Sequence, residues 1–259
     1  MIDRSEPQVF TIRHRPLGTV DGPALAAGCA ALDVGRNRET GAGTLLVEFA
    51  PGWRFEGETT GATELFVRSG ELALDGRRLA TGAYCYLPAG GGPLHLSSEA
   101  GAEAFVLHRP DPTVPVESIV VRSSFAVPWE SIVLPGFPAG AMHKSLRPHD
   151  GTGEAHGGPD GFLRLVLTPP GWLSADEERH VGCWEENILL RGDMLMPGRG
   201  TLAPGDCLAN PAGHWHGPMV TKGGALFLVN CDAPMPVEYR PHAPGPAVLE
   251  RYLESAPWG

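Results

Sequence analysis

The sequence repeats itself once, and this duplication constrains the fold more than any other feature. Four short blocks of the first half recur in the second half in the same order, at offsets of 119 to 123 residues. The paired blocks are residues 44–53 and 163–172, 64–72 and 186–194, 82–90 and 205–213, and 104–108 and 225–229. Four ordered matches indicate duplication of one domain, so we expect two copies of a single fold.

Each copy has the pattern of an all-β domain. Short segments rich in Val, Leu and Phe alternate with turn residues, and the 259 residues include 35 glycines and 26 prolines. Regularly spaced short strands with such turn signals predict a β-sandwich or a barrel. Helical periodicity is nearly absent, and the one expected helix covers residues 246–254, with Pro246 in its first turn.

A proline-rich segment, residues 109–118, marks the expected boundary between the two copies. Prolines at this density favour a linker over a strand. We therefore expect an N-terminal barrel over residues 1–115 and a C-terminal barrel over residues 116–259, the second ending in the short helix.

Charge and composition exclude several classes of function. The formal net charge is −10, and no cluster of Lys and Arg offers a binding face to a nucleic acid. No apolar stretch is long enough to cross a membrane, and the N-terminal residues lack the apolar core of a signal peptide. Five cysteines without a CxxC pair then predict reduced thiols in a cytoplasmic protein.

The spacing of Gly, His, Glu and Pro in the second copy resembles the two motifs of the cupin family. The matching residues are Gly205, Pro211, Gly213 and His216 for the second motif, and His180, Glu186 and Gly192 for the first. The first motif departs from the family pattern at one ligand position, because Gly182 stands where a second histidine is usual. This departure leaves a gap that a substrate or another histidine could fill.

The Pro-Gly-Trp sequence in each copy and the segment 210–218 further resemble the ChrR-like branch of the cupins. The resemblance covers roughly residues 15–240. It implies two tandem cupin barrels, each a double-stranded β-helix or jelly roll, with little helix. It also implies a homodimer.

The second copy holds a candidate metal site. Alternate residues of a strand share a face, so His180 and Glu186 are expected to point into the barrel, where His216 joins them from a later strand. Two imidazoles and one carboxylate form a facial triad with open positions for water, dioxygen or substrate. His214, two residues before His216, is either a fourth ligand or a residue of the pocket rim.

The Glu185–Glu186 doublet leaves the register of this strand open, because neighbouring residues point to opposite faces. Glu186 is favoured because it lies six residues before Gly192, as Glu64 lies six residues before Gly70 in the first copy. A carboxylate inside a barrel is costly unless it is paired or bound to a metal. We therefore expect the inward glutamate to be a ligand.

The first copy keeps the glycines of the motif frame but has no histidine at a usual ligand position. Its ligand positions hold Glu58, Thr60, Glu64 and Pro93, and His95 lies two residues beyond the last of these. Glu58, Glu64 and His95 would form a weaker metal set. A metal-free barrel kept for structure or dimerisation is the favoured interpretation, with one divalent ion per chain.

The resemblance implies a metal-dependent enzyme that acts on a small oxygenated organic molecule. Fe(II) and dioxygenase chemistry are favoured for two histidines and one glutamate. Zn(II), Mn(II) or Ni(II) would instead act as a Lewis acid in an isomerase, cyclase or dehydratase. A zinc-binding regulatory cupin of the anti-sigma type is a third hypothesis, and the lack of an N-terminal helical segment speaks against it. The sequence identifies no catalytic residue beyond the ligands and no organic cofactor.

Overall fold

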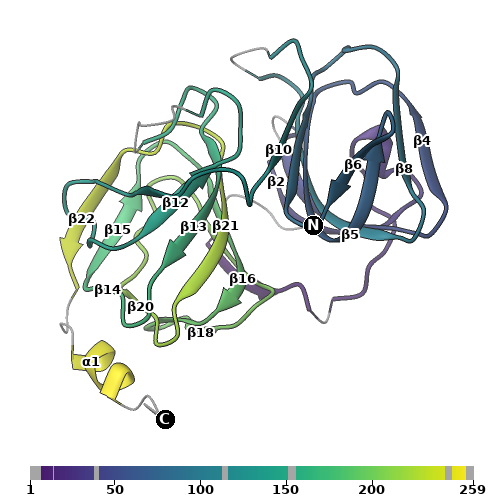
Figure 1. Ribbon diagram of the computed structural model, residues 1–259. Helices are drawn as coiled ribbons and strands as arrows, with labels where there is room; N and C mark the ends of the chain where they lie inside the picture. Colours follow the sequence, from purple (N-terminus) through teal and green to yellow (C-terminus); the bar gives the residue numbers. More distant parts are fainter. Residues whose placement is uncertain are drawn as a thin grey trace. The chain divides into compact units, whose positions relative to one another are not determined.

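The computed structural model describes residues 7–13, 15–37, 41–112, 116–150, 156–242 and 247–254. These residues form two compact units, each a rolled β-structure (Figure 1). The first unit ends at Val127. The second unit begins at Pro128 and also takes in the described part of Ser5–Arg13.

The described part of the first unit consists of one 3-10 turn and nine strands. These are η1 (Ala24–Ala26), β2 (Ala30–Arg36), β3 (Gly43–Phe49), β4 (Trp53–Gly57), β5 (Ala62–Leu74), β6 (Arg77–Ala80), β7 (Ala83–Leu87), β8 (Leu94–Ser98), β9 (Ala102–Arg109) and β10 (Val120–Ser123). The main path of the sheet runs β10-β7-β5-β9-β3-β2. The long strand β5 also pairs with β6 and β8, and β8 pairs with β4, so the sheet rolls into a barrel.

The second unit has the same plan with more, shorter strands. Its elements are β1 (Gln8–Thr11), β11 (Glu130–Ser131), β12 (Met142–Ser145), β13 (Phe162–Thr168), β14 (Leu173–Ser174), β15 (Asp176–His180), β16 (Glu185–Gly192), β17 (Met194–Met196), β18 (Gly200–Leu202), β19 (Asp206–Asn210), β20 (Met219–Val220), β21 (Ala225–Cys231), β22 (Val237–Pro241) and α1 (Ala247–Glu254). The main sheet runs β1-β19-β16-β21-β13-β12-β11. A four-stranded sheet, β14-β20-β17-β18, and the pair β15-β22 complete the unit.

The order of the strands confirms the duplication. The central path is β7-β5-β9-β3 in the first unit and β19-β16-β21-β13 in the second. These strands carry the four paired sequence blocks, in matching places. The all-β prediction is confirmed, and the expected C-terminal helix is α1, which spans eight residues. Among the described residues, no helix has the length and hydrophobicity that crossing a bilayer requires.

Each main sheet ends in a strand from outside its own sequence repeat. The N-terminal strand β1 pairs antiparallel with β19 of the second unit. Strand β10, which follows the proline-rich segment, pairs antiparallel with β7 of the first unit. The first compact unit therefore extends past the expected boundary at residue 115 to Val127, and the strand at Gln8–Thr11 belongs to the second unit.

Apolar side chains fill the interior of the first barrel. Every second residue of the central strands belongs to one buried cluster, which includes Leu45, Val47, Leu65, Val67, Cys85, Leu87, Ala104 and Val106. Alternation along each strand directs these side chains inward. In the second barrel the corresponding strands also carry polar residues inward, and these build the site described below.

Two glycines of the repeat lie where strands approach too closely for any side chain. A Cβ atom on Gly192 would lie 1.8 Å from the carbonyl oxygen of Gly224, and one on Gly70 would lie 2.3 Å from that of Gly101. Both glycines follow an irregularity in the strand register, and both have positive φ angles, 86° and 74°. The repeated glycine is therefore a packing requirement of the barrel.

Gly192→Ala should destabilise the protein more than Gly171→Ala. Both positions have positive φ, which costs an alanine about 1–2 kcal/mol. Only Gly192 also meets backbone at clash distance, since nothing lies within 4 Å of a Cβ on Gly171. We expect the free energy of unfolding, measured in urea, to fall by about 2 kcal/mol more for Gly192→Ala. Equal losses in the two variants would contradict the close approach of the strands.

Candidate functional site

Strand β15 brings two titratable side chains to one face. Glu178 and His180 are two residues apart on this strand, and both are buried. Two backbone hydrogen bonds join Glu178 to His216: the amide of Glu178 donates to the carbonyl of His216 (2.8 Å), and the amide of His216 donates back (2.9 Å). This bridge places His216 beside the two residues of β15.

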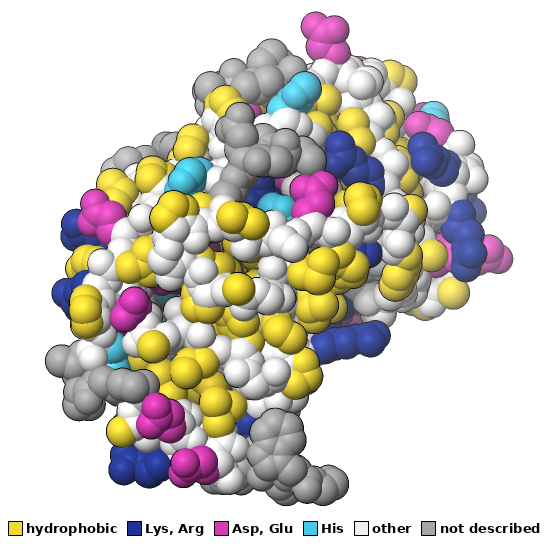
Figure 2. Space-filling model, turned by 60° about the vertical axis from the view of Figure 1, so that its left-hand side comes forward, with side chains coloured by type: hydrophobic (Ala, Val, Ile, Leu, Met, Phe, Trp, Pro, Cys, Tyr) yellow, Lys and Arg dark blue, Asp and Glu magenta, His cyan; other side chains and the backbone are white. Residues whose placement is uncertain are grey.

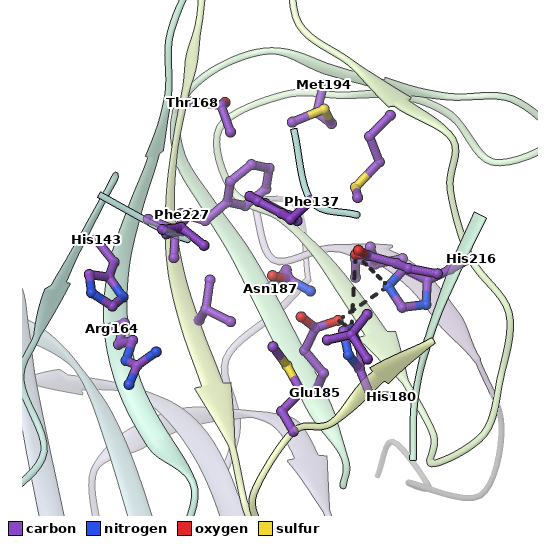
Figure 3. A pocket seen from close by; sticks show the side chains of 18 of the residues that line it. Phe137, His143, Arg164, Thr168, His180, Glu185, Asn187, Met194, His216 and Phe227 are labelled. Carbon is purple, nitrogen blue, oxygen red and sulfur yellow. Dashed lines mark ion pairs between the residues drawn. The ribbon is translucent and has the colours of Figure 1, made fainter. Parts of the chain in front are cut away.

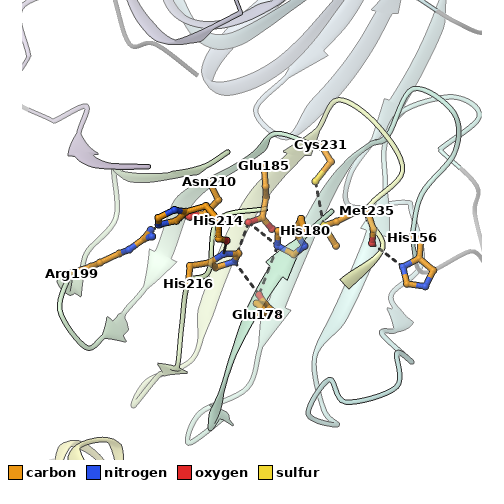
Figure 4. A network of polar contacts seen from close by, with 10 residues as sticks. All are labelled: His156, Glu178, His180, Glu185, Arg199, Asn210, His214, His216, Cys231 and Met235. Carbon is orange, nitrogen blue, oxygen red and sulfur yellow. Dashed lines mark hydrogen bonds and ion pairs between the residues drawn. The ribbon is translucent and has the colours of Figure 1, made fainter. Parts of the chain in front are cut away.

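Glu185, at the start of β16, completes a cluster of four side chains (Figure 4). Its Oε2 atom lies 3.2 Å from Nε2 of His180 and 3.5 Å from Nε2 of His216. The Oε1 atom of Glu178 lies 3.3 Å from Nε2 of His216 and 4.0 Å from Nε2 of His180. The imidazole rings lie close together, with centroids 4.9 Å apart. Two imidazoles and two carboxylates therefore converge on one buried point.

A pair of hydrogen bonds holds Glu185 in place. The side-chain nitrogen Nδ2 of Asn210 donates to Oε2 of Glu185 (2.8 Å), and Nη1 of Arg199 donates to Oδ1 of Asn210 (3.0 Å). Asn210 is fully buried on β19, which pairs with β16. The orientation of the carboxylate is therefore set by the barrel wall and not by the histidines alone.

The structure places Glu186 away from the histidines. Its Oε2 atom accepts a hydrogen bond from Nδ2 of Asn230 (3.0 Å), and neighbouring residues of β16 face opposite sides of the sheet. Counting alternate residues from His180 predicts Glu186 on the face of the histidines, but the structure places Glu185 on that face, because residues 181–184 lie outside any strand. Alternation does not carry across such an interruption.

The counterpart of Glu186 in the first copy also faces away from the interior of its barrel. Glu64, the counterpart of Glu186, lies next to Leu65, which belongs to the apolar core of the first barrel. Glu64 therefore points to the other face of β5, where it accepts a hydrogen bond from the hydroxyl of Tyr84 (2.7 Å). Both repeated glutamates face out of their barrels, so their shared spacing from a glycine marks an outward position.

His214 does not join the cluster through its side chain. Its ring lies on the side of Arg199, directed away from His180 (Figure 4). Its carbonyl oxygen lies 3.3 Å from Nδ1 of His216. His214 thus contacts the cluster through its backbone, because the turn that begins at Pro211 breaks the alternation expected from a strand.

The three candidate ligands of the first barrel lie apart. Glu58 and His95 are exposed, whereas Glu64 is buried and bonded to Tyr84. Within the described parts of the chain, a group that could hold a metal ion is present in the second barrel alone, at Glu178, His180 and His216.

Electrostatics favour positive charge at this cluster. Burial opposes a charge on His180, but the carboxylates of Glu185 and Glu178 outweigh burial and raise the pKa of His180 to about 9. Burial also opposes a charge on Glu185, but His180, His216 and Asn210 outweigh it and hold the pKa of Glu185 well below its usual range. The cluster therefore binds either protons or a cation.

The cluster borders a cavity of about 100 Å³ inside the second barrel (Figure 3). The wall is mainly apolar and includes Phe137, Phe162, Trp172, Met194, Phe227 and Val229. His143 and Arg164 lie on the side opposite His180 and His216. Such a space is suited to a small molecule with an apolar body.

The charge of Arg164 is compensated within the protein. Its Nε atom lies 3.4 Å from Oδ2 of Asp150, and both residues are buried. The guanidinium also lies over the ring of Phe162, 4.2 Å from the centroid. Arg164 thus adds no uncompensated positive charge to the cavity wall.

Sequence comparisons find no family model that matches this chain and no match among curated proteins. Solved structures do match. A proposed dioxygenase from Nostoc punctiforme has a TM-score of 0.70 at 20% identity, with 92% of this chain and 87% of that chain covered. A salicylate 1,2-dioxygenase from Pseudaminobacter salicylatoxidans has a TM-score of 0.59 at 14% identity, with 91% and 89% covered. Protein Ylba from E. coli has a TM-score of 0.57 at 16% identity, with 89% and 93% covered.

These likenesses extend over both barrels, because each covers about nine tenths of the chain. At such low identity they show the fold and leave the activity open. They agree with the expected fold of two tandem jelly-roll barrels and do not single out the ChrR-like branch. The chain therefore has the fold of a cupin with two jelly-roll barrels.

Proposed function

We propose that the second barrel binds one divalent metal ion and that the chain is a metal-dependent enzyme acting on a small oxygenated organic molecule. The observation that carries this proposal is the buried convergence of His180, His216, Glu178 and Glu185 beside an apolar cavity. The fold likeness to two dioxygenase structures favours an Fe(II) dioxygenase.

The residues present fit a divalent ion. Neither ring nitrogen of His180 makes a hydrogen bond of normal geometry, although both are buried. A buried polar atom without such a bond is costly, and a metal at Nε2 would relieve that cost. Imidazole nitrogens and carboxylate oxygens are donors that Fe(II), Zn(II), Mn(II) and Ni(II) all accept.

The proposed ligands differ from the sequence prediction in their carboxylates. Glu178 and Glu185 take the place of Glu186, and His214 contributes no side chain. Glu178 fills the gap that Gly182 leaves in the cupin frame, because it lies two residues before His180 on the same strand face. The ligand that Gly182 cannot provide is thus supplied by Glu178, which precedes His180 in the chain.

Bound Fe(II) would supply the activation of dioxygen and of a substrate oxygen. The chain supplies the other requirements. The carboxylates of Glu178 and Glu185 compensate the charge of the ion, and Asn210 fixes Glu185. The apolar wall excludes water and accepts the carbon skeleton of a small, largely uncharged molecule.

The surface agrees with a small-molecule substrate. On the face shown in Figure 2, hydrophobic side chains gather in the middle, and the described Lys and Arg side chains are dispersed. The described residues of this face therefore offer no continuous track of positive charge to a phosphate backbone. A homodimer and a cytoplasmic location stay predictions.

A non-redox reaction at the same site is the second candidate. The observation that favours it is the second carboxylate, because a set richer in oxygen donors also suits Mn(II). Such an ion would polarise a carbonyl or hydroxyl oxygen for isomerisation, cyclisation or dehydration.

Metal content should depend on Glu185 and not on its neighbour. Glu185→Gln should lower metal affinity by about tenfold or more, because an anionic oxygen beside both histidines is lost. Glu186→Gln, a matched change one residue along the strand, should leave the metal content unchanged. Mass spectrometry of chelator-free preparations measures both.

The same assay separates the two barrels. His180→Ala and His216→Ala should each remove most of the metal, whereas His95→Ala should have no effect because its side chain is exposed. Full metal content in a His180→Ala, His216→Ala double variant would show that the ion is held elsewhere.

Metal affinity should rise with pH up to about 9. The pKa of His180 in the metal-free protein is about 9, so the protonated ring predominates at pH 7 and must lose its proton when the metal binds. Competition with one proton gives about a tenfold gain in affinity per pH unit below that pKa. Calorimetry in buffers of different ionisation enthalpy should detect one released proton at pH 7. An affinity that stays constant between pH 7 and 9 would contradict the charge balance described above.

Exchange of the metal tests the reaction class. The Fe(II) form should consume dioxygen in the presence of its substrate, and the Zn(II) form should not. Oxygen uptake by both forms is measured with a panel of small hydroxyketones and diketones. If the zinc form converts a substrate under nitrogen, the oxygenase assignment is wrong and the Lewis-acid reaction takes its place.

A further inference from the structure

Tyr239 lies beside the proposed metal site but is not one of its ligands. It is on β22, directly opposite Glu178 in the antiparallel pair β15-β22. Opposite residues in such a pair point to the same face, with Cβ atoms about 5 Å apart. Tyr239 also lines the cavity. Its side chain therefore faces the same space as the carboxylate of Glu178.

The hydroxyl of Tyr239 has no hydrogen-bond partner among the described residues, although it is buried. A buried tyrosine hydroxyl usually finds a partner, because the unmet donor is costly. A phenol is an O–H donor at physiological pH, and the described residues offer this one no acceptor.

The ring of Tyr239 is held from the other side by the loop before β12. A Cβ on Gly136 would lie 2.7 Å from Cδ2 of Tyr239, so the loop backbone packs directly against the ring. The same loop carries Phe137, whose ring lies 5.5 Å from that of Trp172 across the cavity wall. This packing of the loop backbone against the ring restricts the position of the hydroxyl before any ligand binds.

Two other polar side chains of the cavity are engaged within the protein. Arg164 pairs with Asp150, and the hydroxyl of Thr168 donates to the carbonyl of Ala225. The phenol of Tyr239 differs from these two because it has no partner among the described residues, a property it shares with Nε1 of Trp172. Of these two unpaired donors, Tyr239 is the one that lies directly opposite Glu178. A molecule that reaches the metal ligands from the cavity would pass within range of it.

We infer that Tyr239 is a catalytic residue that donates a hydrogen bond to an oxygen atom of the molecule bound beside Glu178, His180 and His216. The inference rests on the proposed metal site. It narrows the substrate class to small, mainly apolar molecules with two neighbouring oxygen atoms, one to meet the metal and one to accept from Tyr239. A keto, enolate or hydroxamate oxygen meets this requirement.

The test uses the full chain loaded with Co(II) and acetohydroxamic acid as the probe. Cobalt absorption reports metal binding and probe binding without any need for turnover. Tyr239→Phe removes the hydroxyl and keeps the ring. Tyr252→Phe is the matched control, because the Tyr252 hydroxyl donates to Asp193 and Tyr252 lies on α1, outside the cavity.

Tyr239→Phe should take up cobalt as the wild type does and bind the probe about tenfold more weakly, the effect of losing one hydrogen bond to a charged oxygen. Its melting temperature should not fall, because the hydroxyl has no hydrogen bond to lose among the described residues of the free protein. Tyr252→Phe should bind the probe with wild-type affinity.

Equal probe affinity in the wild type and Tyr239→Phe would overturn the inference and leave the metal site standing. A lower melting temperature with unchanged probe affinity would likewise overturn it, since the hydroxyl would then be structural. If the wild type takes up no cobalt, the proposed function fails, and the role of Tyr239 fails with it.

Discussion

The negative charge of two buried carboxylates must be compensated, and the rest of the second barrel depends on this constraint. Glu178 and Glu185 lie within 4.0 Å of the two histidines and have little contact with solvent. Unpaired charges at such depth would cost several kcal/mol each. Positive charge at the centre is therefore required, and the raised pKa of His180 lets this ring supply it as a proton. Backbone bridges and the Arg199–Asn210 pair serve to keep these groups together.

The two copies show how one fold carries this cluster in one barrel and a packed core in the other. The strand order is the same in both, and the close approach at Gly70 and Gly192 is the same. Thr63 stands in the first copy where Glu185 stands in the second, and its hydroxyl donates to the carbonyl of Gly61 (3.3 Å). An uncharged hydroxyl with a local hydrogen-bond acceptor needs no counterion. The first barrel thus keeps the strand arrangement without a buried charge at this position.

The sequence was sufficient for the architecture and for half of the site. Ordered repeats and turn spacing predict two β-barrels, and the motif frame identifies His180 and His216, which the structure brings together. The carboxylates were missed for a physical reason, since alternation holds only within a continuous strand and residues 181–184 interrupt it. Glu178 had a usable signal, because it shares the face of His180 on β15. No sequence signal predicted that β1 pairs with β19 or that β10 pairs with β7, because long-range strand pairing leaves no local pattern.

Anomalous X-ray diffraction from crystals of the iron-loaded full chain tests the central claim most directly. Data collected on both sides of the iron absorption edge locate the ion without reference to activity. One peak per chain is predicted, within bonding distance of Nε2 of His180 and His216 and of the carboxylates of Glu178 and Glu185. A peak in the first barrel, or a peak bound by Glu186 or the side chain of His214 in place of these carboxylates, would contradict the proposed centre.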